Sequence, residues 1–139
     1  MTDLRLVGSS VSPYTRKVRA LLRYRRIPYQ FVRAGGVESK ALPPAPLPLI
    51  PYVVLPDHNG ELTEAVVDTT PIINRLEDGY PERAVRPKDP ALAVIDALLE
   101  EFGDEWLAKC MFHFRWSKPA DIQTSSSYLA YAMNMTSTR

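Results

Sequence analysis

The spacing of hydrophobic residues along the first third of the chain changes between a period of two and a period of three to four. The short period predicts strands at residues 4–7 and 29–32, and the longer period predicts a helix at residues 13–25 between them. The inward stripe of this helix consists of Val18, Leu21 and Leu22. Because the return to the second strand is short, we expect two parallel strands joined by a right-handed crossover.

Prolines dominate the next stretch, with five of them between residues 43 and 51. Proline has no N–H to donate within a helix, so we predict a loop at residues 34–49 with room for one helical turn near residues 38–41. Strands are then expected at residues 51–55 and 61–66, and they are joined by a turn that ends in an Asn-Gly pair.

A capping side chain followed by proline marks the start of two helices. The first begins with Ser12-Pro13, and the second begins within Asp68-Thr69-Thr70-Pro71. The second helix is predicted to end at Gly79, and its inward residues are Ile72, Ile73 and Leu76. The resulting order, β-α-β followed by β-β-α, indicates an α/β fold class.

The second half of the chain is predicted to be helical. Glycine, prolines and charges at residues 79–90 are typical of a linker, so we expect an α/β domain at residues 1–78 and a partial α-helical domain at residues 91–139. Apolar residues spaced by three and four form a stripe that we interpret as a core seam: Leu92, Ile95, Leu99, Phe102, Trp106 and Cys110. The Ser/Thr-rich tail after Ser117 is short, so we expect another chain, or a continuation of the domain, to cover this stripe.

Composition narrows the classes of function. The 139 residues include 17 basic and 16 acidic side chains, and this balance gives no case for nucleic acid or an anionic membrane as a partner. The single cysteine, Cys110, excludes an internal disulfide and any metal site built on paired cysteines. The sequence shows neither a signal peptide nor a long apolar run, so we expect a cytoplasmic protein.

The first predicted helix carries a run of basic side chains: Arg16, Lys17, Arg19, Arg23, Arg25 and Arg26. A solvated helix face is the commonest meaning of such a run. Nucleic-acid binding is a weaker alternative, because the only interleaved aromatic residues are Tyr14 and Tyr24 and no reading motif is present.

The segment Ser12-Pro13-Tyr14-Thr15 lies where the first strand leads into the first helix, and a helix N-terminus attracts anions. It resembles the C-P-Y-C active site of glutaredoxins with both cysteines replaced by hydroxyl residues. This replacement points away from redox chemistry and toward holding a thiolate that another molecule supplies.

Together with the order of elements, three motifs resemble the N-terminal domain of cytosolic glutathione S-transferases over about residues 3–78. The first motif runs from Ser12 to Arg19, the second is Ile50-Pro51, and the third is Asp68-Thr69. The resemblance implies a thioredoxin-like domain followed by the start of an all-α domain. It also implies glutathione as co-substrate, a small electrophilic molecule as second substrate, and a homodimer.

The resemblance implies that the Ser12 hydroxyl stabilises the glutathione thiolate and is the catalytic group. Ser10 competes for this role, although Ser9 and Ser10 lie at the strand end, where we expect them to cap the helix. We do not expect Ser12 to be a covalent nucleophile, because neither His58 nor His113 is placed by the sequence to act as its base.

Other positions are implied to bind glutathione: Ser10, Tyr14, Ile50, Pro51, Asp68 and Thr69. In the family the proline of Ile50-Pro51 is cis, which leaves the Ile50 backbone to pair with the cysteinyl part of glutathione. Asp68 and Thr69 would grip the γ-glutamyl end, and a plain N-cap role for them is compatible with this. Arg33 and Lys40 are the only obvious basic candidates for the glycyl carboxylate.

The sequence therefore predicts a serine-type glutathione transferase. A non-catalytic module of the same fold, which serves binding or dimerisation, is the alternative. A glutaredoxin-like oxidoreductase is disfavoured, because the active-site turn contains no cysteine.

Overall fold

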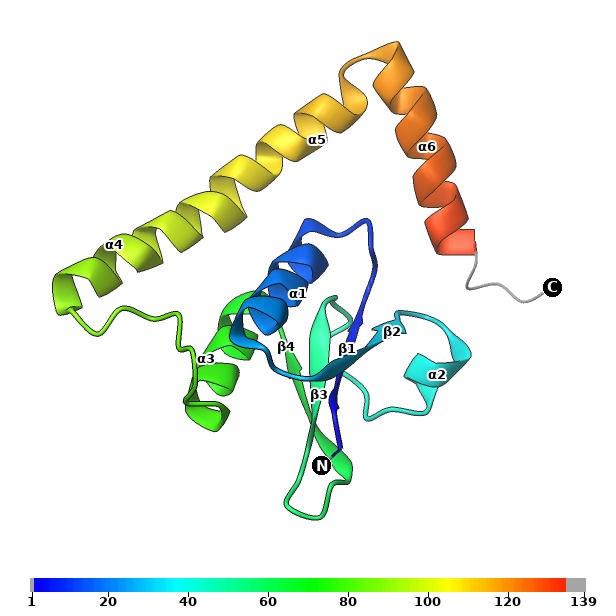
Figure 1. Ribbon diagram of the computed structural model, residues 1–139. Coiled ribbons are helices and arrows are strands. Elements are labelled where there is room, and N and C mark those ends of the chain that lie inside the picture. Colours follow the sequence, from blue (N-terminus) through cyan, green and yellow to red (C-terminus); the bar gives the residue numbers. More distant parts are fainter. Residues whose placement is uncertain (1, 135–139) are drawn as a thin grey trace. The chain divides into compact units, whose positions relative to one another are not determined.

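The computed structural model describes residues 2–134, and its sheet has four strands in the order β2-β1-β3-β4. Strand β1 (Leu4–Gly8) pairs in parallel with β2 (Tyr29–Arg33) and antiparallel with β3 (Tyr52–Pro56). Strand β4 (Leu62–Val67) pairs antiparallel with β3 (Figure 1). This is the predicted thioredoxin-like topology, and each strand boundary differs from its prediction by at most one residue.

Both faces of the two central strands, β1 and β3, are buried. Helices α1 (Pro13–Arg25) and α3 (Thr69–Gly79) contribute to one core cluster with side chains of β1 and β3: Leu4, Leu6, Val18, Leu22, Ile27, Val53, Leu55, Ile72 and Leu76. The opposite face holds Val7, Val32, Tyr52 and Val54, against which residues of the proline-rich loop pack. Successive residues of β1 and β3 point to opposite faces, so both strands are almost continuously buried.

The segment between β2 and β3 is mostly loop, as its prolines predict. Helix α2 (Val37–Lys40) is a single turn with no buried residue and no side-chain cap. Other residues of this loop, such as Leu42 and Ala45, pack against the core cluster on the sheet face opposite α1 and α3.

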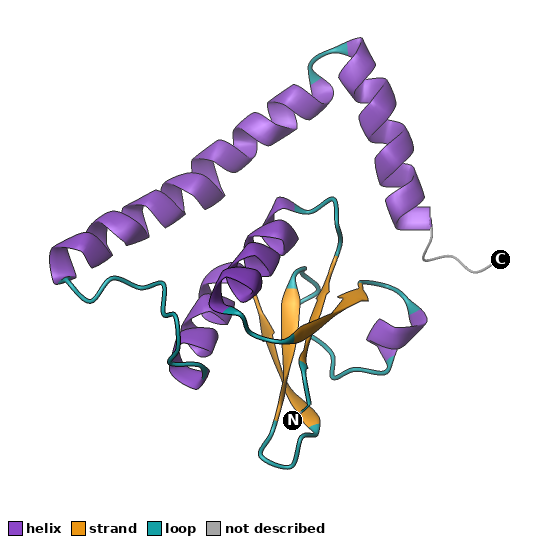
Figure 2. Cartoon of the chain, viewed as in Figure 1, coloured by secondary structure: helices purple, strands orange, loops and turns teal. Residues whose placement is uncertain are grey.

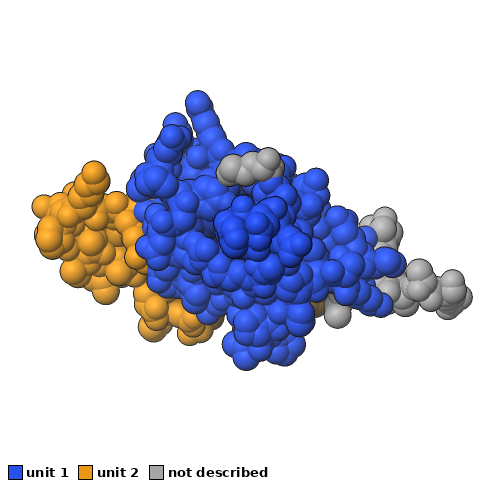
Figure 3. Space-filling model, turned by 90° about the horizontal axis from the view of Figure 1, so that it is seen from below, with its two compact units in different colours: residues 1–84 blue, residues 85–139 orange. Residues whose placement is uncertain are grey.

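The chain divides into two compact units, which we call the N-terminal unit (residues 1–84) and the C-terminal unit (residues 85–139) (Figure 3). The C-terminal unit is helical, with α4 (Pro90–Glu101), a π-helical stretch η1 (Phe102–Leu107), α5 (Ala108–Trp116) and α6 (Pro119–Asn134) (Figure 2). In the described part of the chain, no helix is both long and apolar enough to cross a membrane.

Two features of the C-terminal unit bear on the sequence analysis. Residues 119–134, within the Ser/Thr-rich segment, form α6, whose first residue is Pro119 and whose first turn contains Asp121. The apolar stripe, for which we expect a cover from another chain or a continuation of the domain, is exposed in this chain, since Leu92, Leu99 and Trp106 are 55%, 64% and 63% exposed. The π-helical stretch also interrupts the regular spacing of the stripe, because each π turn takes up an additional residue.

Candidate functional site

The turn between β1 and α1 is shaped by a close contact between Gly8 and Thr15. A Cβ atom at Gly8 would lie 2.6 Å from both Oγ1 and Cγ2 of Thr15, so only glycine fits at this strand end. Thr15 is fully buried, and its Oγ1 accepts a hydrogen bond from the Ser9 N–H at 3.3 Å. The second hydroxyl of the Ser-Pro-Tyr-Thr motif is therefore a structural group that holds the turn.

Ser12 is the N-cap of α1, and its Oγ accepts a hydrogen bond from the Thr15 N–H at 3.2 Å. This confirms the predicted capping side chain before Pro13 and leaves the cap to Ser12 and not to Ser9 or Ser10. Ser10 is exposed, and its carbonyl accepts a hydrogen bond from Arg16 Nε at 3.0 Å. Because the Ser12 oxygen serves as the acceptor in the cap, the hydroxyl proton remains able to donate to a further group.

The start of α3 combines an unusual backbone with a buried hydroxyl. Asp68 is the N-cap with φ 74° and ψ 144°, and its Oδ1 accepts a hydrogen bond from the Thr69 N–H at 2.6 Å. A positive φ at a residue other than glycine is strained, and such residues gather at ligand sites. Thr69 is 2% exposed, and its Oγ1 accepts a hydrogen bond from Lys17 Nζ at 3.4 Å.

The peptide bond between Ile50 and Pro51 is cis. Pro51 is buried and immediately precedes β3, whereas Ile50 is 39% exposed. In the described part of the chain, no hydrogen bond engages the main chain of Ile50. Its N–H and C=O are therefore available to a ligand.

Sheet register brings the three motifs together. Val7 near the end of β1 pairs with Tyr52 at the start of β3, and Tyr52 pairs with Val67 at the end of β4. The segments that contain Ser12, Ile50 and Asp68 therefore leave or enter the sheet at the same end. Tyr14, in the first turn of α1, belongs to the first of these segments. This end of the sheet is the candidate site.

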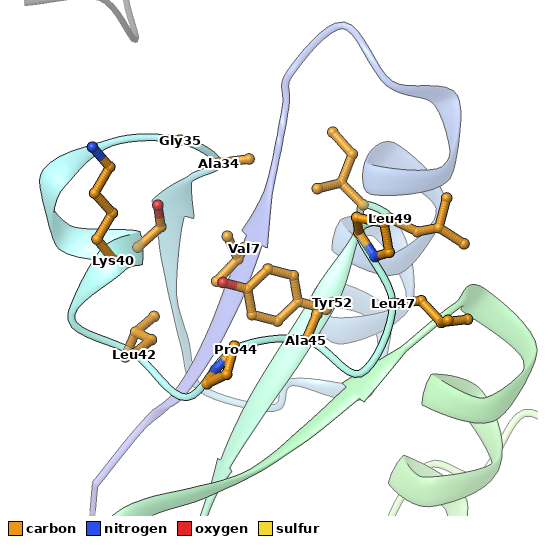
Figure 4. A pocket seen from close by; sticks show the side chains of 13 residues that line it. Val7, Ala34, Gly35, Lys40, Leu42, Pro44, Ala45, Leu47, Leu49 and Tyr52 are labelled. Carbon is orange, nitrogen blue, oxygen red and sulfur yellow. The ribbon is translucent and has the colours of Figure 1, made fainter.

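A cavity of about 330 Å³ lies between the sheet and the proline-rich loop, and Ile50 lines it. Figure 4 shows the Tyr52 ring between Lys40 and Leu42 on one side and Leu47 and Leu49 on the other. Burial raises the pKa of the Tyr52 phenol above its ordinary value. Of the two basic candidates for a carboxylate, Lys40 lines this cavity, and Arg33 ends β2 without lining it.

Lys17 is the residue of this region that sequence reasoning missed. The basic run of α1 suggested a solvated face, but Lys17 instead reaches the first residue of α3. Its position next to the inward-facing Val18 was the available signal, because neighbours of a buried residue lie at the border of the buried face.

A family model described as glutathione S-transferase, N-terminal domain, matches residues 6–84. The chain belongs to the glutathione S-transferase family. No curated protein matches the sequence. The sequence resemblance to this family and the thioredoxin-like fold are thereby confirmed.

Solved structures of the family are similar to this chain. A glutathione S-transferase from Methylobacterium radiotolerans, in complex with glutathione sulfonate, shares 25% identity with a TM-score of 0.65; the match covers 96% of this chain and 61% of that one. A Tau class glutathione S-transferase from mango, Mangifera indica, shares 19% identity with a TM-score of 0.64, over 93% and 60% of the two chains.

FzlA from C. crescentus shares 18% identity with a TM-score of 0.67, over 96% of this chain and 63% of FzlA. At this identity the likeness shows the fold alone, as it does for the mango enzyme. The chain thus spans about three fifths of the length of these three structures.

Proposed function

We propose that the protein binds glutathione at the candidate site and activates its thiol for attack on an electrophilic small molecule. The observation that carries this proposal is the geometry of Ser12, whose oxygen caps α1 while its proton stays available to a thiolate. The proposed setting is a cytoplasmic homodimer with a role in detoxification, in which residues 79–90 link a glutathione-binding domain at residues 1–78 to helices at residues 91–139.

In this proposal Ser12 lowers the pKa of the glutathione thiol, so that more of the thiol is ionised at neutral pH. A free thiol with a pKa near ~8.5 is only about 3% ionised at pH 7, and lowering that pKa by ~2 units raises the ionised fraction to roughly three quarters. A hydroxyl that donates to sulfur stabilises the charged form, and the positive end of the α1 dipole acts in the same direction. The thiolate then forms a bond to the electrophilic carbon by addition or by displacement of a leaving group.

Three segments of the chain each bind a different part of glutathione. Asp68 and Thr69 hold the γ-glutamyl end at the start of α3, where spare N–H groups favour a carboxylate. The main chain of Ile50, before Pro51, pairs with the cysteinyl part. Ser10 and Tyr14, near the start of α1, complete the set of residues that contact glutathione.

Lys40 is the proposed partner of the glycyl carboxylate. It lines the cavity together with Ile50, so its ammonium group and the Ile50 main chain are available to one extended ligand. An ammonium group forms a charge-assisted hydrogen bond with a carboxylate.

Calorimetric titration of the full chain with glutathione tests the binding step. We expect one site per chain, with a dissociation constant in the micromolar-to-millimolar range usual for small substrates. Thr69→Ala and Asp68→Ala should each weaken binding. A folded protein that gives no heat at millimolar glutathione would contradict the proposal.

Steady-state rates with a generic aromatic electrophile test the chemical step. Ser12→Ala should lower the rate at pH 7 by about tenfold or more, because ~1 to 3 kcal/mol of hydrogen bonding to an ionised group is lost. Ser10→Ala is the matched control and should lower it less. An equal or larger loss at Ser10 would assign the catalytic hydroxyl to Ser10 instead.

Ser12→Cys supplies a further test of the same position. A thiol at a helix N-terminus has a lowered pKa and can form a mixed disulfide, so this variant should gain glutathione-dependent disulfide exchange.

A second candidate function is a non-catalytic glutathione-binding module that associates through its helices. The apolar side chains exposed on α4 and α5 favour it, among them Leu98, Leu99 and Phe114. Glutathione binding without turnover for a panel of electrophiles, together with self-association in sedimentation, would support this module over the enzyme.

A further inference from the structure

The charges of the N-terminal unit are unevenly distributed along the sequence. Residues 4–37 contain eight basic side chains and no acidic one: Arg5, Arg16, Lys17, Arg19, Arg23, Arg25, Arg26 and Arg33. Arg25 is neutralised by Glu77 from α3, with 2.8 Å between Nη1 and Oε1. A solvated helix face is the commonest meaning of a basic run, but two arginines of this run act on specific aromatic side chains.

Two of these arginines meet a tyrosine of the edge strand. Arg19 and Arg23 lie one turn apart on α1, and therefore on the same face of the helix. Both guanidinium groups act on the phenol of Tyr29, the first residue of β2, and favour its ionised form by charge and hydrogen bonding. Burial opposes ionisation of this phenol, but the two guanidinium groups outweigh burial, and the pKa of Tyr29 is lowered.

Arg19 is held in place rather than free in solvent. Its guanidinium carbon lies 5.0 Å from the ring centroid of Phe31, which is two residues beyond Tyr29 and on the same face of β2. Its Nε is buried and has no hydrogen-bond partner. An arginine ordered by an aromatic ring, beside a second arginine and a phenol, is typical of a site prepared for an anion.

We propose that Arg19, Arg23 and the Tyr29 hydroxyl form a binding site for a phosphate group, either inorganic phosphate or the phosphate monoester of a small molecule. Two guanidinium forks and a phenol offer more donors than the two oxygens of a carboxylate can accept, whereas a phosphate dianion accepts from all three groups.

This site is separate from the proposed glutathione site. Tyr29 pairs with Leu4 at the start of β1, whereas the glutathione residues gather where β1 ends. The two sites therefore lie at opposite ends of the same strand. A variant at one site should leave the other unaffected, which keeps the two proposals separately testable.

Calorimetric titration of the full chain with inorganic phosphate, at pH 7 and low constant ionic strength, tests the site. We expect one site with a dissociation constant in the low millimolar range or below. Glycerol phosphate in a parallel titration distinguishes the sources, because tighter binding of the ester indicates a monoester and tighter binding of the inorganic ion indicates free phosphate. No binding of either by ~10 mM would overturn the proposal.

Two variants and a matched control show whether the site is specific. Arg19→Gln and Arg23→Gln should each weaken phosphate binding by about fivefold or more. Arg26→Gln removes a nearby charge that does not act on Tyr29, and it should weaken binding by no more than about twofold. Thr69→Ala should leave phosphate binding unchanged. An equal loss of phosphate binding in Arg26→Gln would indicate a diffuse basic surface and overturn the site. Binding of a single-stranded oligonucleotide without binding of phosphate would do the same.

Ultraviolet titration of the tyrosines supplies a second readout. Bound phosphate should raise the pKa of Tyr29 toward its ordinary value, because the anion cancels the field of the charged groups that act on this phenol, Arg19 and Arg23. Subtracting the titration of Tyr29→Phe isolates this group from the other tyrosines. A shift no larger than the one that chloride produces at matched ionic strength would contradict the site.

Discussion

Helices α1 and α4 begin in the same way and end in different surroundings. Each follows a capping side chain and a proline, Ser12-Pro13 in one and Asp89-Pro90 in the other, and each carries an apolar stripe. Leu22 of α1 is fully buried, whereas Leu99 of α4 is 64% exposed. The same local signals therefore start both helices, but only the stripe of α1 is buried.

The largest expected effect comes from replacing one leucine of each stripe by alanine. Leu22→Ala should lower the free energy of unfolding by about 2 to 5 kcal/mol, because it removes a buried side chain and leaves a cavity. Leu99→Ala, the control in α4, should cost less than about 1 kcal/mol, because the side chain is already mostly in water. Urea denaturation measures both. Equal losses would mean that another surface covers the α4 stripe in solution.

Two glycines test how tightly each unit is packed. Gly8→Ala should lower the free energy of unfolding by about 1 to 3 kcal/mol, because its Cβ would lie 2.6 Å from the Thr15 side chain. Gly103→Ala should instead stabilise the C-terminal unit by up to about 1 kcal/mol, since a Cβ there meets nothing within 4 Å and alanine favours a helix.

A rescue experiment isolates the contact at Gly8. Combining Gly8→Ala with Thr15→Ala removes both Thr15 atoms that the new methyl group would strike, so the double variant should lose less stability than the two single losses added together. Additive losses would assign the cost of Gly8→Ala to the backbone of the strand end.

Removing the two caps should affect helicity differently. Ser12→Ala and Asp89→Ala each remove a side chain that accepts from a first-turn N–H, at a cost of about 1 kcal/mol. Far-ultraviolet circular dichroism should detect lost helix only in Asp89→Ala, because α1 is also held by its buried stripe. An equal loss of helix in Ser12→Ala would show that α1 depends on its cap as much as α4 does.

The smallest expected effect concerns a surface ion pair between α3 and β4. Arg75 Nη2 lies 2.8 Å from Glu64 Oε2, and Arg75 Nε also donates to this carboxylate. Hydrogen bonding from Arg75 lowers the pKa of Glu64 in the folded state, and partial burial opposes this only in part. The pair therefore stabilises the fold above the ordinary pKa of glutamate, and this contribution is lost as the pH falls through the lowered one.

Glu64→Gln measures this contribution. At neutral pH the loss should be less than about 1 kcal/mol, because both side chains are more than a third exposed and solvent screens them. The difference from the unmodified chain should vanish in acid and shrink in high salt. Glu105→Gln, at an exposed position of the C-terminal unit, should change stability at neither pH.

Local chemistry explains which features could be predicted from the sequence. Proline at the first helical position places the start of α1, and hydrophobic periods of two and three to four mark the four strands and helices α1 and α3. The caps at Ser12 and Asp68 were predicted from the same local chemistry, whereas the resemblance to the family assigned Ser12, Ile50-Pro51 and Asp68-Thr69 to a glutathione site. The cis state of Ile50-Pro51 was also implied only by the family resemblance.

Contacts between distant residues were decided by the tertiary structure alone. The hydrogen bond from Lys17 to Thr69 spans 52 positions, and the arginines on Tyr29 act from a different element. Periodicity specifies that a helix has an apolar face, but burial of that face requires a second surface, and in the described chain the sheet buries the stripes of α1 and α3 while that of α4 stays exposed.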